Sequence, residues 1–121
     1  MLQNTLIKLE NQLKNSLLTP SEQVIFLDVF KHYSAGKWVY PGALKRITKI
    51  HINKIYNVLN LLEQADIITS YFEVICQECK KTNGIIYNSI NEIPDSIECD
   101  NCGNIDAFHN AFLIYKVNAD E

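Results

Sequence analysis

The chain has 121 residues, 47% of them hydrophobic and 21% charged, which is typical of a folded globular protein and not of a disordered one. Its net charge of −3 conceals opposite halves, because residues 1–70 carry eight basic and five acidic side chains whereas residues 71–121 carry three and nine. No apolar run is long enough to cross a membrane, and the N-terminal residues lack the apolar core of a signal peptide. We therefore expect a cytoplasmic protein with two modules, no membrane partner and reduced cysteines.

Leucines recur every three or four residues at the start of the chain, which predicts an amphipathic helix over residues 1–18. The leucines are Leu2, Leu6, Leu9, Leu13 and Leu17. This stripe can pack against its own domain, or it can form a short coiled-coil seam for a homodimer through residues 2–17. The packed alternative is slightly favoured, because two heptads are fewer than a convincing coiled coil contains.

A second helix is predicted to start at the sequence TPSE. Thr19 can cap the helix, Pro20 suits the first helical position, and Glu22 can reach back to the Thr19 amide. Its inward residues are expected to be Val24, Leu27, Phe30 and Tyr33, flanked by Ile25, Phe26 and Val29. Gly36 suits the C-terminal end of this helix.

Two further helices and several strands follow. An extended piece ending at Pro41 leads into a short helix over residues 41–47, and a turn separates it from a longer helix over residues 51–64. Segments rich in aromatic and β-branched residues predict strands at 70–75, 84–87 and 111–117.

Residues 43–68 resemble the helix-turn-helix core of winged-helix proteins. Ala43 and Leu44 open the first helix, Ile50 lies in the turn, and the second helix closes as LLEQADII. Asp66 stands where glycine is more usual, and aspartate tolerates the left-handed conformation better than most residues. The resemblance implies a winged helix-turn-helix domain over residues 19–74, with the following segment replacing the wing or extending from its place.

If the resemblance holds, the second helix of this motif is a recognition helix. Asparagine can pair with adenine, lysine can meet guanine or a phosphate, and the basic residues of the preceding helix can meet phosphates. The candidate nucleic-acid-binding residues are Lys45, Arg46, Lys49, His51, Asn53, Lys54 and Asn57. No acidic residue lies between Asp28 and Glu63, which favours this interpretation over an ordinary solvated surface.

Four cysteines form two matched pairs, each with two residues between its members. Cys76 and Cys79 are separated by nineteen residues from Cys99 and Cys102. This spacing is typical of a closed four-thiolate zinc site, which is structural and not catalytic, although iron cannot be separated from zinc on sulfur count. Gly103 can adopt the positive φ that a metal-binding turn requires. Residues 75–121 are therefore predicted to form a zinc ribbon that holds one structural Zn²⁺.

Together these patterns predict an α+β chain, in which a mainly helical winged helix-turn-helix domain precedes a small antiparallel β zinc ribbon. This order of modules is similar to that of transcription initiation factor E. No catalytic arrangement of side chains is recognisable, so we do not expect an enzyme. The expected function is nucleic-acid binding by a small transcription-type regulator, with duplex DNA as partner. The alternative is a non-catalytic adaptor or accessory subunit within a larger protein assembly.

Overall fold

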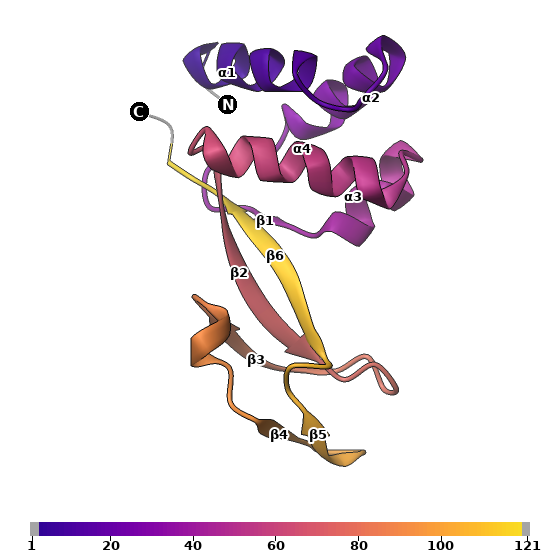
Figure 1. Cartoon of the computed structure of the whole chain (residues 1–121), viewed down its shortest axis with the longest axis vertical. Coiled ribbons are helices and arrows are strands. Elements are labelled where there is room, and N and C mark those ends of the chain that lie inside the picture. Colours follow the sequence, from indigo (N-terminus) through magenta and orange to yellow (C-terminus); the bar gives the residue numbers. More distant parts are fainter. Residues whose placement is uncertain (1–2, 120–121) are drawn as a thin grey trace. The chain divides into compact units, whose positions relative to one another are not determined.

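The computed structural model describes residues 3–119, which combine α-helices with antiparallel strands and so confirm the predicted α+β class. The chain divides into two compact units (Figure 1). Unit 1 comprises Met1–Thr69 and Tyr115–Glu121, and unit 2 comprises Ser70–Ile114. These units differ from the domain boundaries predicted from the sequence, because the first helix belongs with unit 1 and the end of the chain returns to unit 1.

Helices make up most of unit 1 (Figure 1). They are α1 (Gln3–Lys14), α2 (Pro20–Phe30), α3 (Pro41–Thr48) and α4 (Ile52–Gln64). Helix α1 contacts α2 and α4, and α3 contacts the same two helices. All four contribute to the buried core of unit 1, in which the ring of Phe30 stacks on Phe26 at 5.3 Å and on Tyr33 at 5.1 Å between centroids. The other buried core residues of these helices and their connections include Leu9, Leu13, Leu18, Leu44, Ile50, Ile55, Val58, Leu59 and Leu62.

The predicted start of α2 is confirmed by its hydrogen bonds. The Thr19 hydroxyl accepts from the Glu22 N–H at 3.2 Å, and the Glu22 carboxylate accepts from the Thr19 N–H at 3.0 Å. The predicted end was wrong, because the helix stops at Phe30 and Gly36 lies in the following connection. Lys31 takes the C-cap position instead.

The predicted inward face of α2 was also partly wrong. Phe26 and Phe30 are fully buried, whereas Val24 is 68% exposed. A step of three residues falls short of a full turn in a helix with 3.6 residues per turn. Residues spaced by three therefore move steadily around the helix, and Val24 and Leu27 do not share the buried face of Phe26 and Phe30. The buried residues Phe26, Phe30 and Tyr33 follow steps of four and three, which stay on one side.

The leucine stripe of α1 faces the core of its own unit. Leu9 and Leu13 are buried, which supports the packed alternative for these two side chains. Helix α1 ends at Lys14, so Leu17 lies beyond it and is exposed. Leu2 lies outside the described residues.

One four-stranded sheet has the order β1-β6-β2-β3. Its strands are β1 (Trp38–Val39), β2 (Ile68–Ile75), β3 (Thr82–Tyr87) and β6 (Ala111–Val117). Strand β1 pairs antiparallel with β6, placing Trp38 opposite Lys116 and Val39 opposite Tyr115. The strand before α3 is therefore paired with the last strand of the chain, and β6 is the neighbour of β2 even though the cysteine-containing segment separates them in the sequence.

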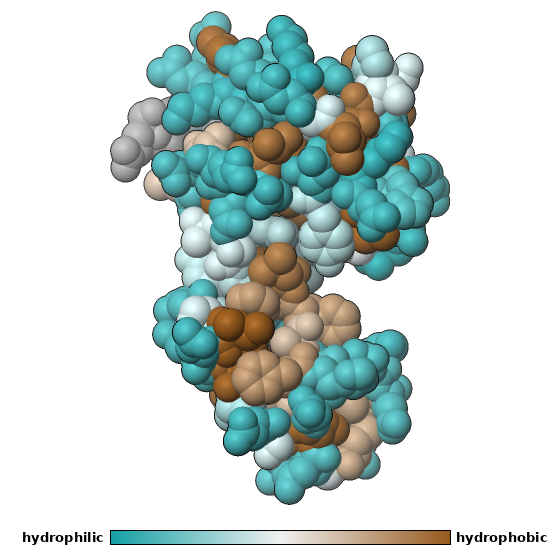
Figure 2. Space-filling model, in the orientation of Figure 1, coloured by the Kyte–Doolittle hydropathy of each residue, from teal (hydrophilic) through white to brown (hydrophobic). Residues whose placement is uncertain are grey.

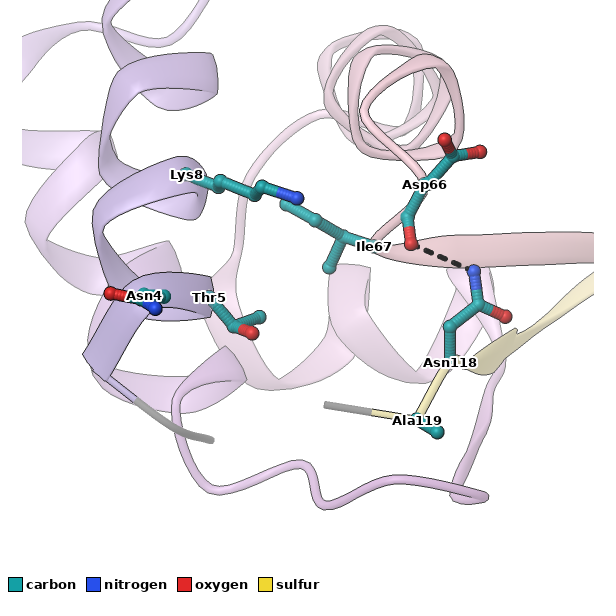
Figure 3. A pocket seen from close by; sticks show the side chains of 7 residues that line it. All are labelled: Asn4, Thr5, Lys8, Asp66, Ile67, Asn118 and Ala119. Atoms are coloured by element: carbon teal, nitrogen blue, oxygen red, sulfur yellow. Dashed lines mark hydrogen bonds between the residues drawn. The ribbon is translucent and has the colours of Figure 1, made fainter. Parts of the chain in front are cut away.

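The end of β6 is tied to the segment that follows α4 (Figure 3). Asn118 donates its backbone N–H to the Ile67 carbonyl at 3.0 Å and its side-chain amide to the Asp66 carbonyl at 2.9 Å. Asp66 has a φ of 60°, so the left-handed conformation predicted for it is confirmed. A pocket of about 750 Å³ adjoins this contact and is lined by Asn4, Thr5, Lys8, Asp66, Ile67, Asn118 and Ala119.

Unit 2 has a small core under strands and turns. Besides parts of β2 and β6 it contains β3, the short 3-10 helix η1 (Ile90–Glu92), β4 (Ser96–Cys99) and β5 (Gly103–Asp106), of which β4 and β5 form a separate antiparallel pair. Val74, Ile93 and Ala107 are buried together. The half-buried residues around them are Phe72, Tyr87, Ile97, Ile105 and Ala111.

Candidate metal centre and nucleic-acid interface

Four sulfur atoms converge in unit 2. The Sγ atoms of Cys76, Cys79, Cys99 and Cys102 all lie within 4.8 Å of one another, and all four cysteines are free. Across the two pairs, Cys76 Sγ lies 3.6 Å from Cys102 Sγ, and Cys79 Sγ lies 3.3 Å from Cys99 Sγ. A tetrahedron with metal–sulfur bonds of about 2.3 Å has edges of about 3.8 Å. The cluster therefore has the size and the donor set to hold one metal ion.

The backbone turns in the same way after each cysteine pair. Lys80 follows Cys79 with a φ of 62°, and Gly103 follows Cys102 with a φ of 75°, as predicted for this glycine. In the first turn the Lys80 N–H donates to the Cys76 carbonyl at 2.7 Å. The two turns thus have matching left-handed positions, although only the second has the residue type that adopts them without strain.

Hydrogen bonds within the cluster shift the pKa values of three of its thiols. Hydrogen bonds from the backbone N–H groups of Cys79 and Glu78 lower the pKa of Cys76 to about 7. The hydrogen bond with Cys76 raises the pKa of Cys102 to about 12, and the hydrogen bond with Cys99 raises the pKa of Cys79. Four thiolates this close would repel one another, and a bound cation would offset that repulsion.

Asn110 supports the first cysteine pair through hydrogen bonds to the residues beside it. Its side-chain oxygen accepts from the Gln77 N–H at 3.1 Å, and its side-chain amide donates to the Asp106 carbonyl at 2.7 Å. The Asn110 carbonyl also accepts from the Ile75 N–H at 2.9 Å. This residue is buried and holds the turn between Cys76 and Cys79 in place. This role is not predictable from the sequence, because nothing in the spacing of a single asparagine indicates it.

The predicted phosphate-contacting residues are exposed on unit 1. Lys45 and Arg46 lie in the last turn of α3, and Lys49 caps that helix with a φ of 62°. His51 caps the start of α4, where its Nδ1 atom accepts from the Asn53 N–H at 3.2 Å. These five side chains lie on or beside the turn that joins the two helices, and all are accessible to solvent.

Two further predicted residues already have partners within unit 1. The Lys54 ammonium group lies 2.8 Å from the Glu22 carboxylate, and this pair lowers the pKa of Glu22. The Asn57 side-chain oxygen accepts from the Leu17 N–H at 2.9 Å. Contacts of Lys54 or Asn57 with a base edge would compete with these bonds, and the sequence spacing gave no sign of them.

Comparison of the chain with protein-family models, with curated proteins and with solved structures gives no match. Within residues 3–119, none of the helices combines the length and the apolar character that a membrane span requires.

Proposed function

We propose that the chain is a winged-helix protein that binds duplex DNA and whose ribbon is stabilised by one structural Zn²⁺. Zinc suits four cysteine sulfurs in a tetrahedron, and a set of four protein ligands leaves no position for a substrate. Iron in the same site is the alternative, and metal analysis distinguishes the two. The ion would be held by Cys76, Cys79, Cys99 and Cys102 and would contribute folding energy to unit 2.

The order of the elements supports the winged-helix part of this proposal. Helices α2, α3 and α4 are followed by the neighbouring strands β2 and β6, and β6 also pairs with the short strand that precedes α3. In this proposal, strands β2 and β6 take the part of the wing. The cysteine-containing segment is inserted between them in the sequence, so we propose that the ribbon extends from the place of the wing.

The observation that carries the DNA proposal is the exposed basic cluster of Lys45, Arg46 and Lys49, called the α3 cluster below. It lies in a stretch of unit 1 that contains no acidic residue from position 29 to position 62. Cations at the end of one helix, beside the start of the next, are well placed to meet phosphates while the second helix approaches a groove. His51 and Asn53 are then the first candidates for contacts with base edges, because Lys54 and Asn57 are engaged elsewhere.

A salt titration tests this proposal. Fluorescence anisotropy with the metal-loaded protein and a labelled duplex of about 20 base pairs should show binding that weakens steeply as salt rises. Arg46→Ala and Lys49→Ala should each reduce the slope of log K against log salt by about one unit. Lys8→Ala removes an exposed lysine of α1 and is the matched control, which should leave the slope unchanged. Absence of any binding at about 50 mM salt would reject the DNA proposal.

A second candidate function, a protein-interaction adaptor, is favoured by the surface of unit 2. Residues 70–114 contain seven acidic and two basic side chains, a charge that repels nucleic acid. Several large apolar side chains are nevertheless exposed in unit 2, namely Ile85, Ile90, Phe108 and Phe112. Figure 2 shows hydrophobic residues gathered on one face of this unit. Stable co-purification with a large assembly, by a protein without affinity for DNA, would favour this function over the first.

A further inference from the structure

Helix α1 presents a second stripe, distinct from its buried leucines. Ile7, Glu10 and Lys14 recur at helical spacing and are exposed, and the exposed Leu17 follows three residues after Lys14, beyond the end of α1. The N–H groups of residues 15 and 16 donate to the carbonyls of residues 12 and 13 at 3.1 Å, which forms a turn between α1 and Leu17. We call these four residues the α1 stripe. Its two ends are apolar and its centre carries one acidic and one basic side chain.

A shallow apolar groove runs beside the α1 stripe, between α1 and α2. Its volume is about 320 Å³. The groove is lined by Glu10, Leu13, Lys14, Pro20, Gln23, Val24 and Leu27. Val24 and Leu17 are the most exposed of the large apolar side chains described, at 68% and 64%. Contiguous exposed apolar side chains rimmed by charge are typical of a protein-interaction surface.

The order of charges along the α1 stripe makes it complementary to itself. When two copies of α1 cross antiparallel about a two-fold axis near residue 12, Glu10 of each copy meets Lys14 of the other. The same register brings Ile7 of each copy toward the C-terminal end of the other copy's α1, beyond which the exposed Leu17 follows. A two-fold interface requires this reciprocity, since one patch must fit itself. A parallel crossing would instead place like charges opposite each other.

We propose that the chain forms an antiparallel homodimer through the α1 stripe and the adjoining α1–α2 groove. Leu9 and Leu13, the centre of the seam predicted from the sequence, are not available for it because they are buried within unit 1. The apolar side chains of the stripe and groove supply the affinity, and the two reciprocal ion pairs fix the register. The proposal does not depend on DNA binding, although a two-fold dimer would present two α3 clusters to a pair of half-sites.

Charge reversal tests the register directly. Sedimentation equilibrium of the metal-loaded protein should show a dimer that dissociates on dilution in the micromolar range. Glu10→Lys and Lys14→Glu should each raise the dimer dissociation constant by about tenfold or more, because each places two pairs of like charges in contact. The double variant Glu10→Lys/Lys14→Glu should bring the constant back to near the wild-type value.

The control is Asp28→Lys, which makes the same change of charge on α2. It breaks the exposed ion pair between Asp28 and Lys31, which lie 3.0 Å apart and outside the α1 stripe and the groove. It should leave the dissociation constant unchanged, and circular dichroism should show that all variants remain folded. A wild-type protein that stays monomeric at about 1 mM, or a double variant that dimerises no better than the single ones, would overturn the proposal.

Discussion

The two units of this chain are stabilised by different means. Most of the buried hydrophobic residues described belong to unit 1, where helices and aromatic stacking enclose a continuous core. Unit 2 contributes Val74, Cys76, Ile93, Cys99, Ala107 and Ile114 to the buried set, and two of these six are cysteines. A unit of this size rarely folds on apolar burial alone and usually needs disulfides or a metal. We therefore propose that the four sulfurs stabilise unit 2 by holding a metal ion, a contribution that the larger core of unit 1 does not need.

The largest expected effect comes from removing one sulfur. Cys99→Ser should release the metal and unfold unit 2, because structural zinc contributes on the order of 10 kcal/mol to folding in small zinc domains. Asp100→Ser alters an exposed neighbour in the same turn and should retain the metal. Metal analysis after gel filtration measures the release of metal. Amide exchange of residues 70–114 measures the unfolding of unit 2. If amide exchange in unit 2 of Cys99→Ser were as slow as in the wild type, unit 2 would not depend on its sulfur atoms for stability.

The next effect should be confined to unit 1. Leu59 is fully buried in α4, so Leu59→Ala should lower the free energy of unfolding of this unit by about 2–5 kcal/mol. The exposed Ile47 of α3 provides the control, and Ile47→Ala should change that free energy by less than about 0.5 kcal/mol. Urea unfolding followed by circular dichroism measures both, and metal content should stay constant. Loss of metal in Leu59→Ala would show that the two units are not independently stabilised.

A smaller effect should follow in unit 2 when Asn110 is truncated. Asn110→Ala removes the acceptor for the Gln77 N–H and the donor to the Asp106 carbonyl, at a cost of about 1–3 kcal/mol. Because this side chain orients the first cysteine pair, the affinity for zinc should fall by about tenfold. Asn104→Ala, in the exposed part of β5, is the control. Competition with a chromophoric chelator measures the affinity, and equal values for both variants would deny Asn110 a positioning role.

The smallest changes in stability are expected in the two turns that follow the cysteine pairs. Lys80→Gly should stabilise unit 2 by up to about 1 kcal/mol, because a non-glycine residue with a φ of 62° is strained. Gly103→Ala should destabilise it by about 1–2 kcal/mol through strain alone, since an added Cβ would meet no atom within 4 Å. Thermal unfolding of the metal-loaded protein measures both. If Lys80→Gly and Gly103→Ala changed the unfolding temperature in the same direction, the two turns would not be equivalent.

Local chemistry was predictable from the sequence. The capping box at Thr19, the left-handed Asp66 and the positive φ of Gly103 each follow from the properties of a few neighbouring residues. The convergence of the four cysteines followed from their spacing, because two turns with two intervening residues each present paired sulfurs. Short-range rules are sufficient for features of this kind.

Tertiary packing could not be predicted in the same way. The partners of Lys54 and Asn57 lie more than 30 residues away in the sequence. Both side chains were therefore predicted to be exposed and available for nucleic acid. Strands β4 and β5 were missed because each has only four residues and they pair with each other around the second cysteine pair. The exposed Val24 shows that an apolar residue at near-helical spacing need not face the core when the helix is short and its neighbours decide the packing.

Metal analysis with chelation tests the central claim most directly. Protein purified without added metal should contain one zinc per chain. Chelation under reducing conditions should abolish the dispersed amide resonances of residues 70–114 while those of α1 to α4 persist, and added zinc should restore them. A metal-free, reduced chain in which residues 70–114 keep their dispersed resonances would contradict the account.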